Sequence, residues 1–131
     1  MPFFGPDPEH PTPAFWQLID QAKTDPQAAK ARIKKMSRVE LVAFYWASHD
    51  AAELLREALF EDETQLPSED GVEDAMAWAV AQGEAVYREV LAGRRLLPNE
   101  PGRFTDLVGA VVVQYQKTYR EKVPYPEDLV P

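Results

Sequence analysis

Residues 68–87, SEDGVEDAMAWAVAQGEAVY, predict the helix around which we expect the fold to be organised. Asp70 is a suitable N-cap residue, and Glu73 follows it three positions later, as in a capping box. Apolar and small residues then recur at spacings of three and four, which is typical of one helix face: Val72, Met76, Val80, Gly83, Tyr87, Val90 and Leu91. We therefore predict one continuous central helix that ends near Ala92, with Gly93 as its left-handed C-terminal residue.

Small residues along this central helix predict a close packing contact. Ala75, Ala79 and Gly83 are spaced by four residues and form a smooth ridge on the helix surface. Because a glycine inside a helix costs about 1 kcal/mol relative to alanine, it needs a compensating reason. We expect Gly83 to let the central helix approach the backbone of the helix predicted over 38–60.

Two helices near the N-terminus have the same start signal. Thr12 followed by Pro13, and Asp25 followed by Pro26, each combine an N-cap residue with a proline at the first helical position. The first helix carries an apolar stripe, and the second, QAAKARIKKM, has a basic exposed face.

The clearest helix start in the chain lies at Ser37. Ser37 and Glu40 have the spacing of a capping box, and Met36 and Leu41 occupy the two positions of a hydrophobic staple. A long helix is expected over 38–60, with these residues facing inward: Leu41, Phe44, Tyr45, Ser48, Ala52, Leu55 and Leu59.

A last helix is expected from Asp106 to about Lys122, with Thr105 as its N-cap. Its apolar face consists of Leu107, Val108, Val111, Val112, Tyr115 and Tyr119. The valine-rich segment GAVVVQY is also compatible with a strand, but the length of the pattern and the lack of a partner strand favour a helix.

These signals predict an all-α fold, a single-domain helical bundle of about four to five helices that covers 14–122. Five prolines make 1–13 an extended arm, and 123–131 form an extended tail. Phe3 and Phe4 either pack onto the domain or are offered to a partner. Part of the core is expected to be covered by three tail residues: Tyr125, Leu129 and Val130.

Composition excludes several classes of protein. The 131-residue chain has no cysteine, which excludes disulfides, thiolate catalysis and thiolate metal ligands. No apolar run approaches the roughly 18 residues of a membrane span, and the proline-rich start does not resemble a secretory signal. We therefore expect a cytoplasmic protein without a membrane partner. The scattered glycines form no phosphate-binding loop, and no cofactor is expected.

Charge is distributed unevenly along the chain. The formal net charge of −8 disfavours binding to nucleic acids, whose phosphates are negative. Residues 23–38 nevertheless contain six basic residues and one acid, whereas 49–74 contain ten acids and one arginine. This dipolar surface either keeps the protein soluble or steers a charged partner toward it.

Three segments together resemble a bacterial family known as domain of unknown function 4240. They are FWQLID at 15–20, RVELVAF at 38–44 and the central stretch 68–87, and the resemblance covers roughly 15–97. Met76 and Glu84 stand where the family usually has basic residues. The matching positions are Phe15, Trp16, Leu18, Ile19, Asp20, Ala43, Phe44, Ser68, Glu69, Asp70, Gly71, Val72, Trp78, Gln82 and Gly83. The resemblance implies an α-helical fold and no established activity.

Residues with metal-binding chemistry are sparse. His49 and Glu53 are one helical turn apart, and with Glu69 and Glu73 they could hold a divalent cation inside a bundle. The alternative is a solvated acidic face, since the chain lacks the repeated glutamate and histidine motif of known bundle sites. We assign no metal ligand and no catalytic residue.

Aromatic and acidic residues supply the remaining binding candidates. The three tryptophans could line a shared groove with Tyr45 and Tyr87, or they could pack in the core. Asp70 is explained as a helix cap, whereas Asp20 is either a hydrogen-bond acceptor at the core edge or a functional acid. The full set of candidate binding residues is Trp16, Asp20, Trp46, His49, Asp50, Glu53, Asp70, Trp78 and Gln82.

The function that these observations favour is a protein-interaction module, either an adaptor or an immunity-type neutralising partner, present as a monomer or weak homodimer. The alternative is a metal-dependent enzyme that uses acidic helix residues around His49 and Glu53. A third hypothesis is nucleic-acid binding through the basic segment 23–38, which the net charge disfavours.

Overall fold

A computed structural model describes residues 13–59, 69–98 and 104–128 of the chain. Several segments discussed above lie outside these residues: Phe3 and Phe4 of the arm, the acidic loop within 60–68, and Leu129 and Val130 of the tail. The described elements are α1 (Pro13–Thr24), α2 (Pro26–Lys34), α3 (Arg38–Leu59), α4 (Glu69–Ala81), α5 (Glu84–Leu91), α6 (Leu107–Tyr119) and the 3-10 turn η2 (Pro126–Asp128). The predicted all-α class is confirmed, with six α-helices instead of four to five and no strand in the described part.

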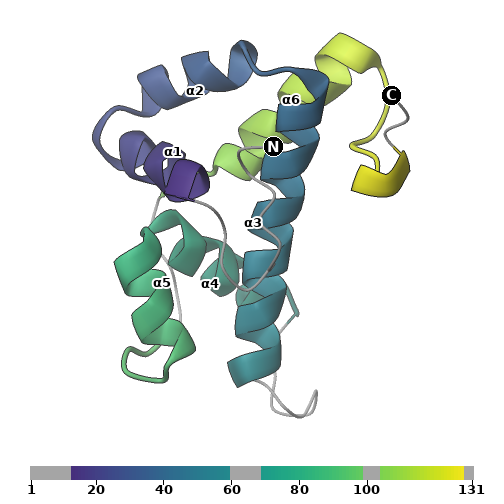
Figure 1. Cartoon of the computed structure of the whole chain (residues 1–131). Coiled ribbons are helices and arrows are strands. Elements are labelled where there is room, and N and C mark those ends of the chain that lie inside the picture. The colour runs from purple at the N-terminus through teal and green to yellow at the C-terminus, as the bar shows by residue number, and fades with distance from the viewer. Residues whose placement is uncertain (1–12, 60–68, 99–103, 129–131) are drawn as a thin grey trace.

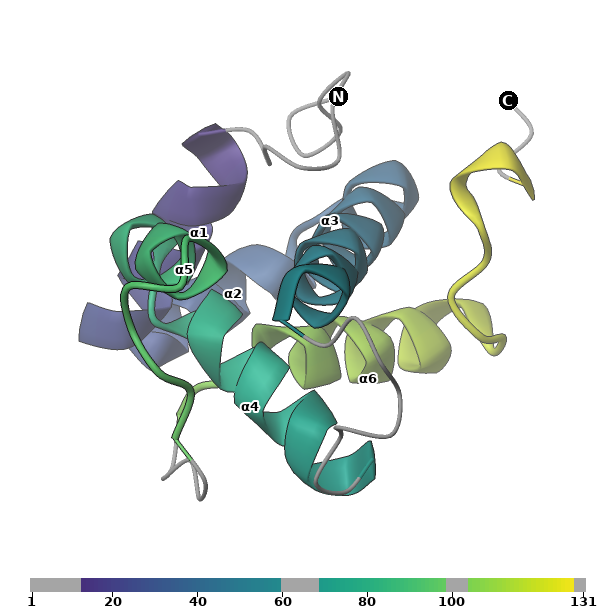
Figure 2. The same ribbon diagram turned by 90° about the horizontal axis from the view of Figure 1, so that it is seen from below.

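The helix at the centre of the fold is α3. It packs against α4, α5, α6 and η2, while α1 packs against α2 and α4. Figure 1 shows α3 as the long helix in the middle, with α1 and α2 beside its upper part. Figure 2 shows that α4 and α6 lie on the same side of α3. The stretch 68–87, which was expected to form the central helix, is therefore a neighbour of the organising helix α3 and not the organising helix itself.

Local capping signals account for where α2 and α3 begin. Asp25 accepts a hydrogen bond from the backbone N–H of Ala28 at 3.1 Å, which confirms the predicted start of α2. Ser37 and Glu40 form both hydrogen bonds of the capping box, at 3.1 and 3.2 Å. These starts were predictable because each cap and its partner lie within three residues of one another.

The last helix is shorter than predicted, and its cap is a different residue. Asp106 is the N-cap and accepts from the N–H of Gly109 at 3.2 Å, so the expectation for Thr105 was wrong. The helix ends at Tyr119 because Arg120 takes a left-handed conformation with φ of 60°.

The predicted continuous helix from residue 70 to Ala92 is broken at Gly83. α4 ends at Ala81 and α5 begins at Glu84, with Gly83 as N-cap at φ 103°. Apolar residues on both helices face the same core. The helical spacing of apolar residues in the sequence therefore continues across the break, and the break could not be predicted from that spacing. α4 also begins at Glu69, which places Asp70 inside its first turn and not at the N-cap; the side chain of Asp70 lies outside the described part.

Gly83 was expected to touch the backbone of α3, but it contacts α1 instead. A Cβ atom at this position would lie 2.8 Å from Oδ1 of Asp20, which belongs to α1. The Nζ of Lys23, also on α1, donates to the carbonyl oxygen of Gln82 at 2.8 Å. Gly83 therefore permits a turn against α1, while Ala75 and Ala79 are buried on α4, which does pack against α3.

A cluster of aromatic rings joins α1, α3 and α5 in the core. The ring centroid of Phe15 lies 4.9 Å from that of Trp16 and 5.1 Å from that of Phe44, and Trp16 lies 5.2 Å from Tyr87. The hydroxyl of Tyr87 donates to the carbonyl oxygen of Ala51 at 2.8 Å. The FW pair of the FWQLID segment is therefore a packing element.

The buried side of α3 is broader than one stripe. Leu41, Phe44, Ser48 and Leu55 are buried as predicted, whereas the other three predicted inward residues are only half-buried: Tyr45, Ala52 and Leu59. Four further residues of α3 are buried: Val42, Ala43, Ala47 and Ala51. The reason is that α3 has neighbouring helices on several sides, so more of its circumference is covered.

Candidate functional site

A groove of about 300 Å³ opens between α3, α4 and the start of α6. Its floor is apolar and includes the side chains of Ile19, Met76, Val80 and Leu107, each no more than 5% exposed. The complete lining is Ile19, Tyr45, Ser48, His49, Ala52, Glu53, Arg56, Met76, Ala77, Val80, Ala81, Phe104, Thr105, Asp106, Leu107 and Val108. Four helices thus contribute to one concave surface, which is the usual form of a binding site.

Polar groups stand at the rim of the groove. α3 contributes His49, Glu53 and Arg56 from successive turns, and the start of α6 contributes Asp106. His49 and Asp106 are exposed, whereas Glu53 and Arg56 are half-buried. An apolar floor with a polar rim suits a guest that buries a hydrocarbon surface and places polar groups at the edge.

A second hollow of about 250 Å³ extends the groove toward α1. It adds Ala22, Lys23 and Gln82 to a wall that both hollows share, formed by Ile19, Ala81, Phe104, Thr105 and Leu107. Since Lys23 donates to the carbonyl oxygen of Gln82, the junction of α4 and α5 is held at this end of the groove.

Ser48 is an unusual residue in the wall of the main groove. It is 5% exposed, and its Oγ has no hydrogen-bond partner among the described residues. A buried hydroxyl without a partner lowers stability because it loses its hydrogen bonds to water. The sequence predicted that Ser48 faces inward but contained no sign of the missing partner.

Replacing Ser48 with alanine is expected to raise the free energy of unfolding by about 0.5–1 kcal/mol. The variant removes the unpaired hydroxyl and gains helix propensity. Urea denaturation measures the change, with Ser37→Ala as the matched control, because loss of that N-cap should lower stability by about 1 kcal/mol. A clear loss of stability in Ser48→Ala would mean that its hydroxyl is paired in the folded protein.

The structure brings only part of the predicted binding set to the groove. His49 and Glu53 stand at the main hollow and Gln82 at the second. Asp20 is exposed beside Gly83, and Trp78 is half-buried against the core. Asp50 lies outside the lining, and its Oδ1 is 3.5 Å from Nδ1 of His49.

The tryptophans do not form a shared aromatic groove, so that alternative was wrong. Trp16 is 4% exposed and packs in the core against Phe15 and Tyr87. Trp46 belongs to a separate group at the side of α3, where its ring lies 4.8 Å from that of Tyr125. Its Nε1 donates to the carbonyl oxygen of Pro124 at 2.7 Å. Trp46 therefore attaches the C-terminal segment to α3.

No three histidine or acidic side chains of the described residues come together as a metal site. His49 and Glu53 stand on the same face of α3, as their spacing predicted. The side chains of Glu69 and Glu73, the other two members of the predicted set, lie outside the described part.

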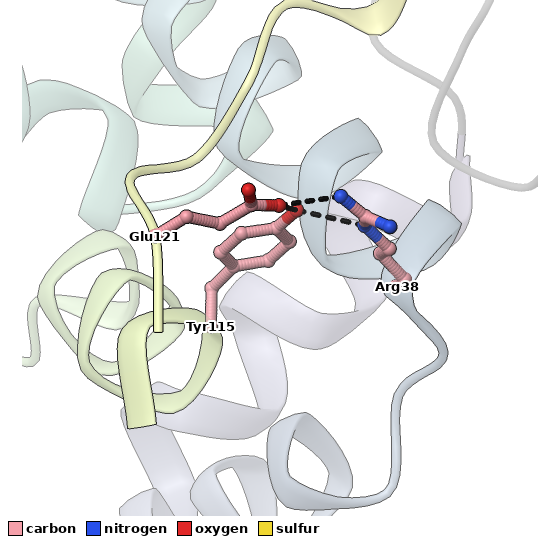
Figure 3. A network of polar contacts seen from close by, with 3 residues as sticks. All are labelled: Arg38, Tyr115 and Glu121. Carbon is pink, nitrogen blue, oxygen red and sulfur yellow. Dashed lines mark hydrogen bonds and ion pairs between the residues drawn. The ribbon is translucent and has the colours of Figure 1, made fainter. Parts of the chain in front are cut away.

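Sequence reasoning missed a polar network between the start of α3 and the end of α6. The Nε of Arg38 donates to the hydroxyl of Tyr115 at 2.8 Å, and this hydroxyl donates to Oε1 of Glu121 at 3.0 Å. Arg38 and Glu121 also form an ion pair, which completes the triangle in Figure 3. The guanidinium lies 5.3 Å from the ring centroid of Tyr119, which adds a cation–π contact.

Burial raises the pKa of Tyr115 above its ordinary value, because the low-dielectric surroundings disfavour the phenolate. The folded protein therefore binds this proton more tightly than the unfolded chain, where tyrosine ionises near pH 10. The contribution to stability is complete below about pH 10 and is lost as the pH rises through the folded pKa.

Tyr115→Phe tests this network by its pH dependence. Near pH 8 the variant should be less stable than the parent by about 1 kcal/mol, because two hydrogen bonds of the hydroxyl are lost. The difference should narrow above about pH 10, where only the parent loses the contribution of this phenol. Urea titrations over this range measure both effects, and a difference that widens at high pH would contradict the raised pKa.

Comparisons of the chain with models of known families, with curated proteins and with solved structures find no match. None of the helices in the described ranges has both the length and the apolar character that crossing a membrane requires.

Proposed function

We propose that this chain is a small protein-interaction module of the bacterial cytoplasm, an adaptor or an immunity-type neutralising partner, and a member of the domain of unknown function 4240 family. The observation that carries the interaction is the groove between α3, α4 and α6, with its apolar floor and polar rim. The partner inserts apolar side chains into this groove and meets the rim with polar groups.

The construction of the groove supports this mode of binding. Its floor residues are also core residues, and they come from α1, α4 and α6. Such walls are fixed by packing before a partner arrives, so little ordering entropy is lost on binding. A groove between helices is also the kind of surface that receives the apolar face of an amphipathic helix.

Filling the groove tests the proposal. Ala77→Phe places a ring at the groove wall, whereas Ala31→Phe places the same ring on the exposed surface of α2. Both variants are used as baits beside the parent chain in quantitative affinity capture from native cells. We expect the parent and Ala31→Phe to enrich the same proteins. With Ala77→Phe the enrichment of these proteins should fall at least about tenfold, which corresponds to a loss of about 1.4 kcal/mol in binding free energy.

Thermal unfolding of both baits first establishes that they are folded. Equal enrichment by all three baits would show that the groove is not the binding surface. If none of the baits enriched any protein over an unrelated bait, the proposal of an interaction module would be contradicted.

A further inference from the structure

We infer that the partner segment that enters the groove is basic, with apolar anchor residues flanked by lysine or arginine. This inference rests on the proposed function and specifies the chemistry of the partner. It is carried by the charges around the main hollow and by the absence, among the described residues, of ion pairs that would occupy its carboxylates.

Carboxylates predominate around the main hollow. Glu53 and Asp106 belong to its lining, Glu57 follows Glu53 by one turn of α3, and Asp74 precedes Ala77 by one turn of α4. Among the described residues of the lining, Arg56 is the only arginine or lysine. A cationic guest is therefore favoured at this rim, and a phosphate or an acidic segment is repelled.

Some acids away from the groove are held in ion pairs, whereas these acids in and beside the groove form none with the described residues. Away from the groove, three arginines form ion pairs with glutamates: Arg88 with Glu84, Arg95 with Glu89, and Arg38 with Glu121. Within the described part of the chain, no ion pair involves Glu53, Glu57 or Asp74. Their charges are available to an incoming cation without breaking an existing pair.

Ser48 provides a second and independent observation. Its Oγ is buried in the same wall and has no partner among the described residues, although most buried polar groups in proteins are paired. If the Ser48 side chain turns toward the groove when a peptide binds, a polar atom of the peptide backbone would supply the missing partner, which a purely hydrocarbon guest cannot do. Ser48→Ala should therefore weaken peptide binding by about threefold to tenfold while the protein stays folded.

Three synthetic helical peptides test the charge preference directly. They share leucines at positions i, i+3 and i+7, and their flanking positions carry lysine, glutamine or glutamate. Isothermal titration calorimetry with the full chain measures their affinities. At about 0.05 M salt we expect the lysine peptide to bind about tenfold more tightly than the glutamine peptide, and the glutamate peptide to bind most weakly. The preference should shrink toward zero at about 1 M salt.

Variants with neutral side chains test which carboxylates cause the preference for the lysine peptide over the glutamine peptide. The double variant Glu53→Gln and Glu57→Gln should bind the lysine and glutamine peptides within about twofold of each other. The matched control, Glu84→Gln with Glu89→Gln on α5, removes two carboxylates away from the groove and should keep the preference.

The outcomes separate this inference from the proposed function. Equal binding of the lysine and glutamine peptides by the parent chain would overturn the basic partner but leave protein binding in the groove intact. Absence of binding by the lysine peptide would also overturn it, and the capture experiment would then decide the proposed function alone. Binding of the fatty acid decanoate that excludes the peptides would indicate a small-molecule pocket and would overturn the inference. A dimer abolished by Ala77→Phe would identify a second copy of the chain as the guest and would equally overturn the inference.

Discussion

Gly83→Ala is expected to lower the free energy of unfolding by about 2–4 kcal/mol. Gly83 has φ 103° and ψ 172°, a region that residues with a Cβ atom rarely enter. The new methyl group would also lie 2.8 Å from Oδ1 of Asp20, so α1 or the junction between α4 and α5 must move. The backbone strain and the displacement both act against the native turn.

Ala85→Gly is the matched control for this substitution. Ala85 is exposed on α5, so the glycine should cost only the helix-propensity difference of about 1 kcal/mol. Urea denaturation of the two variants under the same conditions gives both values. A Gly83→Ala protein as stable as the parent would mean that the turn relaxes to a negative φ and that Asp20 moves away without cost.

Phe15→Ala is expected to lower the free energy of unfolding by about 3–5 kcal/mol, the range for deletion of a fully buried ring. Phe15 is 0% exposed and contacts the rings of both Trp16 and Phe44, so its removal leaves a cavity between α1 and α3. Because a typical domain is stable by only 5–15 kcal/mol, the variant should unfold at much lower urea concentration.

Val113→Ala provides the comparison for this loss. Val113 is 65% exposed on α6, and its truncation should change stability by no more than about 0.5 kcal/mol. Similar urea midpoints for the two variants would contradict the placement of the FW pair in the core.

The features that the sequence predicted correctly are those determined by neighbouring residues. The caps at Asp25 and Ser37 each depend on a partner three residues away, and both are present in the structure. The all-α class follows from apolar spacings that are also local. His49 and Glu53 were placed together for the same reason, since they are one helical turn apart.

The features that the sequence did not predict depend on distant parts of the chain. Arg38 is 77 residues from Tyr115 and 83 from Glu121, and no spacing rule joins them. The groove assembles residues of four helices, so only members that belong to the same helix could be proposed as neighbours. At Gly83 the apolar period continued through the break, and the glycine itself was the local sign of a turn.

Site-specific photo-crosslinking from within the groove is the most direct test of the proposed interaction. A photoreactive phenylalanine analogue is placed at Val108, which lines the groove, or at Val113, which lies on the same helix outside it. Irradiation in native cells should give a discrete covalent adduct with a partner protein from position 108 and none from position 113. Adducts of equal yield from both positions, or an adduct from position 113 alone, would contradict binding of a partner in the groove.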